Sequence, residues 1–321
     1  MTDSRLGRRR FLGTAAGAAL ATVAATPAMP SAAFAAPHAA QSTGSAATFS
    51  WLGTSGWRID IGAKTVLVDP YLSRFPTGLF DGAFNPATAL TVDTSRIADH
   101  PGTPATILVT HTHWDHFNDV PYIATQSGAR VFGTLTAYHL GQALGLPAAQ
   151  LSPVKGGEVL DFGDHTVEVV SALHSRNASY SMAFPGVRLA VPARPATVGD
   201  LPEGDTLAYQ VTVQNGPSVF FMGASDFVER NLAGLAPDVA MIAVPATDAT
   251  HDYVPRLLKA LDWPRTVVPV HWDNFEVELR NPPTVSKSDR ARLDLFVSAV
   301  RNAAPRTRII VPEYLTPYTF A

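Results

Sequence analysis

The sequence predicts an α/β protein in which two mixed β-sheets pack face to face, with helices on their outer faces. Three observations lead to this prediction. Short β-rich runs occur in two batches, segments with helical spacing are scattered between and after them, and the first batch is a meander without a βαβ unit. A chain of 321 residues with 46% hydrophobic residues is also long enough to bury a large core.

The first batch of strands is closely spaced. Four short runs rich in apolar and β-branched residues predict strands at 48–52, 57–61, 65–68 and 106–110. Gly62-Ala63 predicts a hairpin turn between the second and third strands. Apolar residues at helical spacing then predict helices at 118–126 and 135–144, and Gly145 ends the second helix.

The second batch spans the remaining chain. Apolar runs predict strands at 167–172, 207–213, 218–222, 239–244, 266–270 and 308–311. Helical spacing predicts helices at 227–235, 253–261 and 288–303. No linker interrupts residues 47–321, so a single domain is expected there. Two segments without regular pattern, 70–104 and 175–205, are long enough to indicate lids or binding loops.

The first 35 residues have the composition of an export signal. Arg8-Arg9-Arg10 precedes an Ala-rich apolar run, and Ala33-Phe34-Ala35 has the small-x-small pattern of a cleavage site. This arrangement resembles a twin-arginine signal peptide over residues 1–35, followed by a flexible Ala/Ser/Gly-rich lead-in over 36–46. The alternative is an N-terminal membrane anchor, but no positive stop-transfer flank follows the apolar run.

Charge and cysteine content fit an exported protein that does not bind nucleic acid. Four Arg and one Asp lie in residues 1–35, so the mature chain would have 20 basic and 26 acidic residues and a net charge of −6. The chain has no cysteine, as expected of a protein that folds in the cytoplasm and crosses the membrane already folded. We expect the export machinery as a partner, no membrane span in the mature form, and a location in the periplasm, the cell wall or the medium.

A dense group of potential metal ligands follows the predicted strand 106–110. The motif HTHWDH places His111, His113, Asp115 and His116 within six residues. Imidazole and carboxylate are the ligands that zinc and similar metals favour, and a loop leaving a strand can direct several side chains to one point. The alternative is a polar surface loop. Three further candidates stand at later strand ends: His174, Asp226 and His271. Each taken alone is more often an ordinary hydrogen-bonded residue, but together, at successive strand ends, they favour a metal site.

The order of these residues resembles the metallo-β-lactamase superfamily over residues 47–315. The VLVDP and PVHWDNF segments look closest to the branch that contains ascorbate-6-phosphate lactonase and N-acyl-phosphatidylethanolamine phospholipase D. The resemblance implies an αββα sandwich with two divalent metal ions at one edge, zinc by default and manganese or iron as alternatives. It implies that one ion is held by His111, His113 and His174, the other by Asp115, His116 and His271, and that Asp226 bridges them.

One departure from the family pattern concerns the bridging residue. The family usually has Gly-Asp at the end of that strand, whereas this chain has Gly223-Ala224-Ser225-Asp226. Asp226 therefore either bridges from a longer turn or does not bridge. Asp69, in VLVDP, is interpreted from the family pattern as a residue that orients a metal-binding imidazole, with a simple turn before Pro70 as the alternative.

The expected activity is metal-dependent hydrolysis. A hydroxide bridging the two ions would be the nucleophile, His116 would complete the second site, and Asp115 would orient the hydroxide and pass its proton to the leaving group. The bond is expected to be of ester type, such as a lactone or a phosphodiester. The fold does not choose among the bonds that the superfamily cleaves, which include lactams, lactones, thioesters, phosphodiesters and sulfate esters. Apolar residues in 73–84 and 182–191 predict a pocket with hydrophobic walls for a lipophilic substrate. An equally good explanation is that these residues pack within the two long loops.

A small-molecule substrate is the expected ligand. Arg176 is a candidate for binding its phosphate or carboxylate, with a solvated arginine as the alternative, and His251 is a second candidate contact. Asp273 is a further polar candidate, but we prefer His271 as the ligand. The remaining histidines, His100, His139 and His165, have no partners in the pattern and are interpreted as structural or exposed.

The same residues bear on three competing functions. A di-iron redox enzyme would have Glu in place of His113 and a flavin partner. A nuclease would need a basic surface. A binding protein that keeps the fold but has lost turnover is the main alternative, and it would hold fewer than two metal ions.

Overall fold

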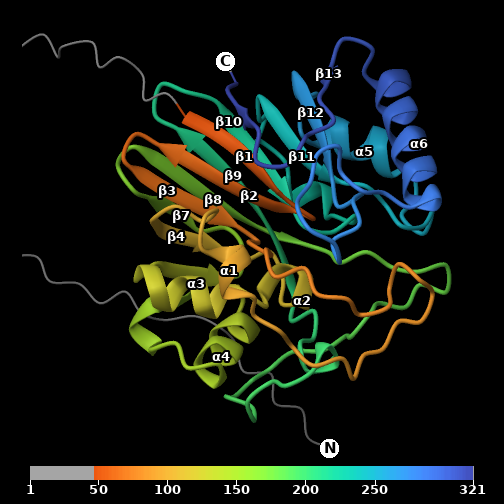
Figure 1. Cartoon of the computed structure of the whole chain (residues 1–321). Helices are drawn as coiled ribbons and strands as arrows, with labels where there is room; N and C mark the ends of the chain where they lie inside the picture. The colour runs from red at the N-terminus through yellow and green to blue at the C-terminus, as the bar shows by residue number, and fades with distance from the viewer. Residues whose placement is uncertain (1–46, 321) are drawn as a thin grey trace, which may run out of the picture. The chain divides into compact units, whose positions relative to one another are not determined.

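Two seven-stranded β-sheets stack against each other in the computed structural model of the chain, which describes residues 47–320 (Figure 1). Buried side chains from both sheets, such as Trp57 and Tyr209, meet in one apolar cluster between them. This burial is the main driving force for stacking the sheets. The predicted signal peptide and lead-in lie outside the described residues.

The first sheet combines an antiparallel and a parallel half. Its strand order is β14-β1-β2-β3-β4-β5-β6. The strands are β14 (Pro317–Tyr318), β1 (Ala47–Gly53), β2 (Gly56–Ile61), β3 (Lys64–Val68), β4 (Pro104–Leu108), β5 (Arg130–Gly133) and β6 (Leu151–Pro153). Pairing is antiparallel from β14 to β3 and parallel from β3 to β6.

The second sheet has the same two halves in the order β13-β12-β11-β10-β9-β8-β7. The strands are β13 (Arg308–Ile309), β12 (Thr266–Val270), β11 (Val239–Ala243), β10 (Ser218–Met222), β9 (Thr206–Val213), β8 (His165–Ala172) and β7 (Val159–Asp161). Pairing is parallel from β13 to β10 and antiparallel from β10 to β7. Val239 to Ala243 of the central strand β11 are all buried, as expected where both faces of a parallel sheet are covered.

Helices cover the outer face of each sheet (Figure 1). On the first sheet lie α3 (Val120–Ser127) and α4 (Leu135–Ala143), and on the second lie α5 (Tyr253–Ala260) and α6 (Lys287–Ala303). Shorter helices are α1 (Thr94–Ile97), α2 (Trp114–Phe117) and the 3-10 turns η1 (Ala148–Gln150), η2 (Val198–Asp200) and η3 (Glu229–Asn231). The αββα sandwich predicted from the sequence is confirmed.

Two helix predictions differ from the structure. The predicted helix 227–235 is reduced to the single turn η3. Its apolar residues Leu232 and Leu235 are buried although the backbone around them is not helical. Asn231 Nδ2 donates to the Ser171 carbonyl of β8 at 2.9 Å, which ties this segment to the sheet. The predicted helix 118–126 begins earlier, as α2, and restarts as α3 after Asp119. The short strands β5, β6 and β7 were not predicted, since three or four residues give too little periodicity.

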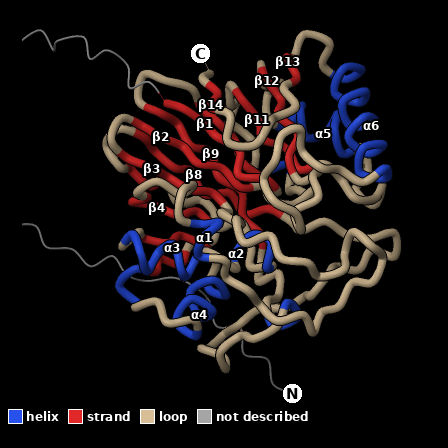
Figure 2. Tube along the Cα trace, viewed as in Figure 1, coloured by secondary structure: helices blue, strands red, loops and turns tan. Residues whose placement is uncertain are grey.

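The two segments predicted as long loops lie against each other (Figure 2). Ala89 and Thr197 form an antiparallel bridge, and the Leu90 and Val198 amides donate to the Ala196 and Thr88 carbonyls. These bonds satisfy backbone groups that a free loop would leave to water. Among the described residues, no helix has the length and apolar character needed to cross a membrane.

A fully buried ion pair anchors the first loop to the end of β12. The Arg74 guanidinium lies 2.8 Å from Asp273 Oδ2, and both side chains are inaccessible to solvent. Asp273 also accepts hydrogen bonds from the Thr54 amide and the Tyr314 hydroxyl. Such a buried carboxylate depends on its partners, because nothing else compensates for the lost hydration.

We expect Asp273→Ala to lower the free energy of unfolding by about 3–5 kcal/mol, because it leaves the Arg74 guanidinium buried without its carboxylate. The control Glu229→Ala breaks the partly exposed Arg256–Glu229 pair and should cost about 1 kcal/mol or less. Urea denaturation followed by circular dichroism measures both values. Similar losses in the two variants would contradict a special contribution from the buried pair.

Candidate metal centre

The candidate ligands stand where strands of both sheets end. His111 and His113 follow β4, while Asp115 and His116 lie in the short helix α2. His174 lies two residues beyond β8, and His271 directly follows β12. The backbone of His271 is left-handed (φ 62°), and its N–H donates a hydrogen bond to the Thr54 carbonyl. Strands fix these positions better than free loops would.

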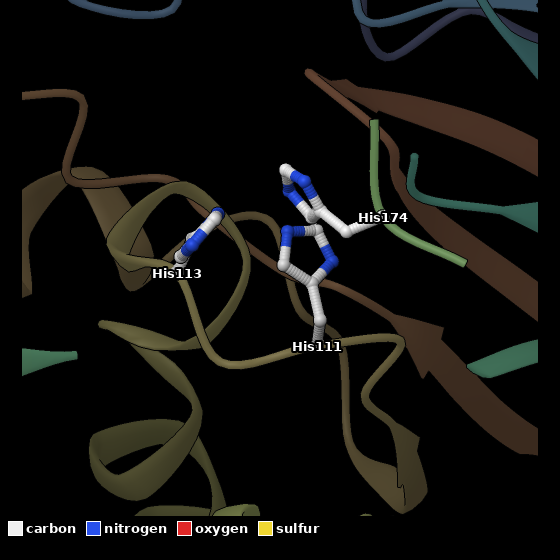
Figure 3. Close-up of side chains that lie close together, drawn as sticks. All are labelled: His111, His113 and His174. Atoms are coloured by element: carbon white, nitrogen blue, oxygen red, sulfur yellow. The ribbon is translucent and has the colours of Figure 1, made fainter. Parts of the chain in front are cut away.

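Three imidazoles form the first cluster. One ring nitrogen from each of His111, His113 and His174 lies within 4.8 Å of the others. The rings converge from two segments of the chain (Figure 3), with centroids 4.6–4.8 Å apart. Neutral imidazoles have no reason to gather at this spacing in a buried pocket without a shared cation, so the geometry fits a metal ion.

A carboxylate and two imidazoles form the second cluster. Asp115, His116 and His271 likewise place one ligand atom each within 4.8 Å of the others. Asp115 Oδ2 lies 3.2 Å from His271 Nε2 and 3.4 Å from His116 Nε2. His111 and His116 connect the two clusters, since their ring centroids are 3.9 Å apart.

Four of the imidazoles are held by their other nitrogen. His111 Nδ1 contacts Thr110 Oγ1, His113 Nε2 the Ala183 carbonyl, His174 Nδ1 the Ser175 carbonyl and His116 Nδ1 Asp69 Oδ2, at 2.8–3.1 Å. Among the described residues, the opposite nitrogen of His111 is buried without a hydrogen-bond partner. The opposite nitrogen of His116 is also buried and makes no hydrogen bond of good geometry, but it faces Asp115 Oδ2 at 3.4 Å. Oriented rings with an unpaired buried nitrogen are the arrangement that a metal ion completes.

The protonation states also suit a cation in the first cluster. Burial lowers the pKa of His113 to about 3 and that of His174 to about 4, and burial with the neighbouring imidazoles holds the pKa of His111 well below its usual value. These rings are therefore neutral near pH 7. Burial acts in the same direction on the pKa of His116, but Asp115 and Asp69 outweigh it and raise that pKa to about 10. A metal ion in the second cluster must therefore displace a proton.

Asp69 orients the second cluster. Its backbone is left-handed (φ 41°), and its buried carboxylate accepts from the Thr110 amide at 2.7 Å, the Thr110 hydroxyl at 2.5 Å and His116 Nδ1 at 2.9 Å. Both interpretations of Asp69 drawn from the sequence therefore describe it, since it turns the chain after β3 and fixes an imidazole.

Asp226 does not join either cluster, which corrects the expectation that it bridges two metal ions. It pairs as a backbone bridge with Leu173, and its carboxylate accepts from the Phe227 amide at 2.8 Å. The residues that follow β10 along the cavity wall are Gly223 and Ala224. A side chain at Gly223 would meet Thr110 Oγ1 at 2.1 Å and Asp69 Oδ2 at 2.8 Å, so this position must stay a glycine.

The proposed substrate contacts lie outside the main cavity. Arg176 donates to the Tyr180 carbonyl and lines a neighbouring cavity of about 660 Å³. His251 is 83% exposed and pairs with Asp252. Of the histidines interpreted as structural, His165 stacks on Phe162 and contacts Asp164, and the His100 carbonyl accepts from Arg58.

An aromatic cavity of about 690 Å³ opens over both clusters. Phe84 and Phe184 come from the two paired loops and pack around Trp114 at 5.7 and 6.2 Å between centroids, while Phe275 lies 5.3 Å from His271. The sequence indicated apolar walls in 73–84 and 182–191, which contain Phe84 and Phe184, but did not single out Phe275. Phe275 lies in the PVHWDNF segment and could have been found there.

Comparison with known proteins agrees with the fold. The family model described as the β-lactamase superfamily domain matches residues 48–271, so the chain belongs to the metallo-β-lactamase superfamily. Within it, the chain belongs to the UPF0173 metal-dependent hydrolases. A member from Cupriavidus necator is 30% identical over 86% of each chain, and one from Myxococcus xanthus is 28% identical over 95% of this chain and 96% of its own.

Solved structures share the fold at low sequence identity. The metallo hydrolase Igni18 from Ignicoccus hospitalis is 17% identical with a TM-score of 0.53, over 86% of this chain and 98% of its own. An isothiocyanate hydrolase from Delia radicum gut bacteria is 20% identical with a TM-score of 0.52, over 85% and 99%. CmlA, a diiron β-hydroxylase from Streptomyces venezuelae, is 16% identical with a TM-score of 0.54, over 87% and 54%.

We expect Asp69→Asn to weaken metal binding by the second cluster about 10–100-fold while the first cluster keeps its affinity. Asparagine is nearly the same size but cannot hold the His116 Nδ1 proton as a carboxylate does. Competition with a chromophoric chelator measures both affinities. In the control Asp226→Ala neither affinity should change, and loss of an ion from that variant would return Asp226 to the centre.

Proposed function

We propose that this hydrolase cleaves an ester-type bond, such as a lactone or a phosphodiester, in a lipophilic substrate at a two-metal centre. The observation that carries the proposal is the pair of three-ligand clusters beneath one aromatic cavity. Zinc is the default ion, with manganese or iron as alternatives, because imidazole and carboxylate accept all three. The sequence resemblance to the branch of ascorbate-6-phosphate lactonase and the N-acyl-phosphatidylethanolamine phospholipase supports this choice of bonds.

The mechanism assigns different tasks to the protein groups. Divalent ions held by the two clusters would supply an activated water and polarise the bond under attack. Asp115 is the one carboxylate among the six ligands, and His116 and His271 hold its pKa well below the usual range against the effect of burial. It therefore stays ionised. As a hydrogen-bond acceptor it would orient the attacking water and shuttle that water's proton to the leaving group. Asp69 keeps His116 in place.

The cavity supports a substrate with an apolar part. Phe80, Phe84, Phe184 and Phe275 line it together with Trp114, and the apolar segment 243–246 continues the wall. An acyl chain or ring would exclude water from the two clusters, which strengthens electrostatic interactions within the site.

Asp115→Ala should abolish turnover and remove most metal from the second cluster, because it deletes a ligand and the proton acceptor together. Mass spectrometry for metal content, paired with chromogenic lactone, phosphodiester and β-lactam probes, tests this and identifies the bond. His113→Ala serves as the matched loss of a first-cluster ligand. Full turnover with two bound ions in Asp115→Ala would exclude the assigned role.

A metal-binding protein without turnover is the second candidate. The absence of Asp226 from both clusters favours it, since Asp115 is left as their single carboxylate. Fewer than two ions per chain, with every probe untouched after zinc or manganese is added, would select this candidate. The fold alone does not decide what the site does, because the diiron β-hydroxylase CmlA has a similar fold and a different activity.

We also propose that the chain is exported through the twin-arginine pathway and works outside the cytoplasm. The paired arginines, the Ala-rich run and the absence of cysteine support this. Replacing Arg8 and Arg9 by Lys should retain the precursor in the cytoplasm, as measured by cell fractionation. Unchanged export of that variant would rule out the twin-arginine route.

A further inference from the structure

Large apolar side chains are exposed in one short stretch beside the cavity. Thirteen of them are exposed among the described residues, and four fall within twelve positions: Tyr180, Val187, Leu189 and Val191. Leu189 is 78% exposed and Tyr180 is 68% exposed. Single exposed apolar residues need no explanation, but a concentration in one loop marks a surface that meets an apolar partner.

The backbone holds these side chains outward. Tyr180 has a left-handed backbone (φ 60°), which is costly for an aromatic residue. Two hydrogen bonds close the turn around it: the Tyr180 N–H donates to the Asn177 carbonyl, and the Asn177 N–H donates to the Ser181 carbonyl. Four residues later, Phe184 points the other way, into contact with His113 and Trp114. The same loop therefore presents one aromatic residue to the cavity and several apolar residues to solvent.

The charge of this loop has one sign. Residues 175–198 contain Arg176, Arg188 and Arg194 and no acidic residue. Within the described residues, their guanidinium groups donate to backbone carbonyls, at Tyr180, at Val187 and Asp200, and at Leu144. The Asp200 carboxylate attracts Arg188 but is already bonded to the amides of Ala196 and Thr197. The cationic charge is thus available to an anionic surface, although the whole chain is acidic.

We propose that the segment 180–194, here named the docking loop, binds the surface of an anionic lipid bilayer. Exposed apolar side chains flanked by arginines are the combination that such an interface selects. Because Phe184 of this loop lines the cavity, docking would place the cavity entrance at the lipid surface. If the proposed hydrolysis is correct, the substrate is then a lipid or an acylated molecule that enters from the membrane.

The experiment is flotation of residues 36–321 with vesicles of phosphatidylcholine alone or with phosphatidylglycerol. This piece contains the whole described domain and omits the predicted signal, whose apolar run would bind lipid by itself. We expect binding only to the anionic vesicles, and weaker binding at high salt. Leu189→Asp should reduce binding at least tenfold, whereas Leu295→Asp on α6, where the leucine is 71% exposed, should leave it unchanged.

Charge reversal tests the arginines. Arg188→Glu with Arg194→Glu should weaken binding by about 25-fold or more, at about fivefold for each arginine lost from the surface. The control Arg301→Glu with Arg306→Glu makes the same change in net charge at exposed positions more than 100 residues after the docking loop, and it should leave binding unchanged.

Three results would overturn the proposal. These are no binding to anionic vesicles, equal effects of the loop variants and their controls, or a dimer in light scattering that Leu189→Asp dissociates without any vesicle binding. The last would assign the loop to a second copy of the chain. None of the substituted side chains lines the cavity, so hydrolysis of soluble probes should persist in every variant. If no variant hydrolysed any probe, that result would count against the proposed hydrolysis and not against membrane binding.

Discussion

The hydrogen bonds of Asp69 are the constraint on which the rest of the site depends. This buried carboxylate, at the end of β3, binds the amide and hydroxyl of Thr110 after β4 and the imidazole of His116 in α2. It therefore fixes the turn that carries the HTHWDH motif, and Gly223 has no side chain because Asp69 and Thr110 occupy the space. A single carboxylate thus joins two strands, one helix and the imidazole of His116.

The two sheets have a common consequence for the ligands. Parallel strands β4 and β12 deliver His111 and His271 from opposite sheets, and antiparallel β8 delivers His174. Burial lowers the pKa of the first-cluster imidazoles, whereas the carboxylates next to His116 raise its pKa. The two clusters therefore differ in charge before any ion binds, which gives them different proton costs for metal binding.

The loops add what the sandwich lacks. The segments 70–104 and 175–205 bond to each other through Ala89 and Thr197 and supply Phe84 and Phe184 to the cavity. The buried Arg74–Asp273 pair holds the first of them to the end of β12, beside His271. Part of the cavity wall thus comes from loops whose positions are set by the two sheets.

The sequence by itself predicted the αββα fold and most strands from hydrophobic periodicity, and four of the six clustered residues from the spacing of HTHWDH, because these are local features. The other two, His174 and His271, followed from the resemblance to the superfamily. It could not decide whether Asp226 bridges, since three residues after a strand can turn either toward or away from the centre. Only the tertiary structure placed Asp226 beside Leu173, put Arg176 in a neighbouring cavity and left His251 exposed. It also brought Phe184 against His113, seventy-one positions earlier in the chain. Such contacts depend on how distant loops pack, which no local pattern records.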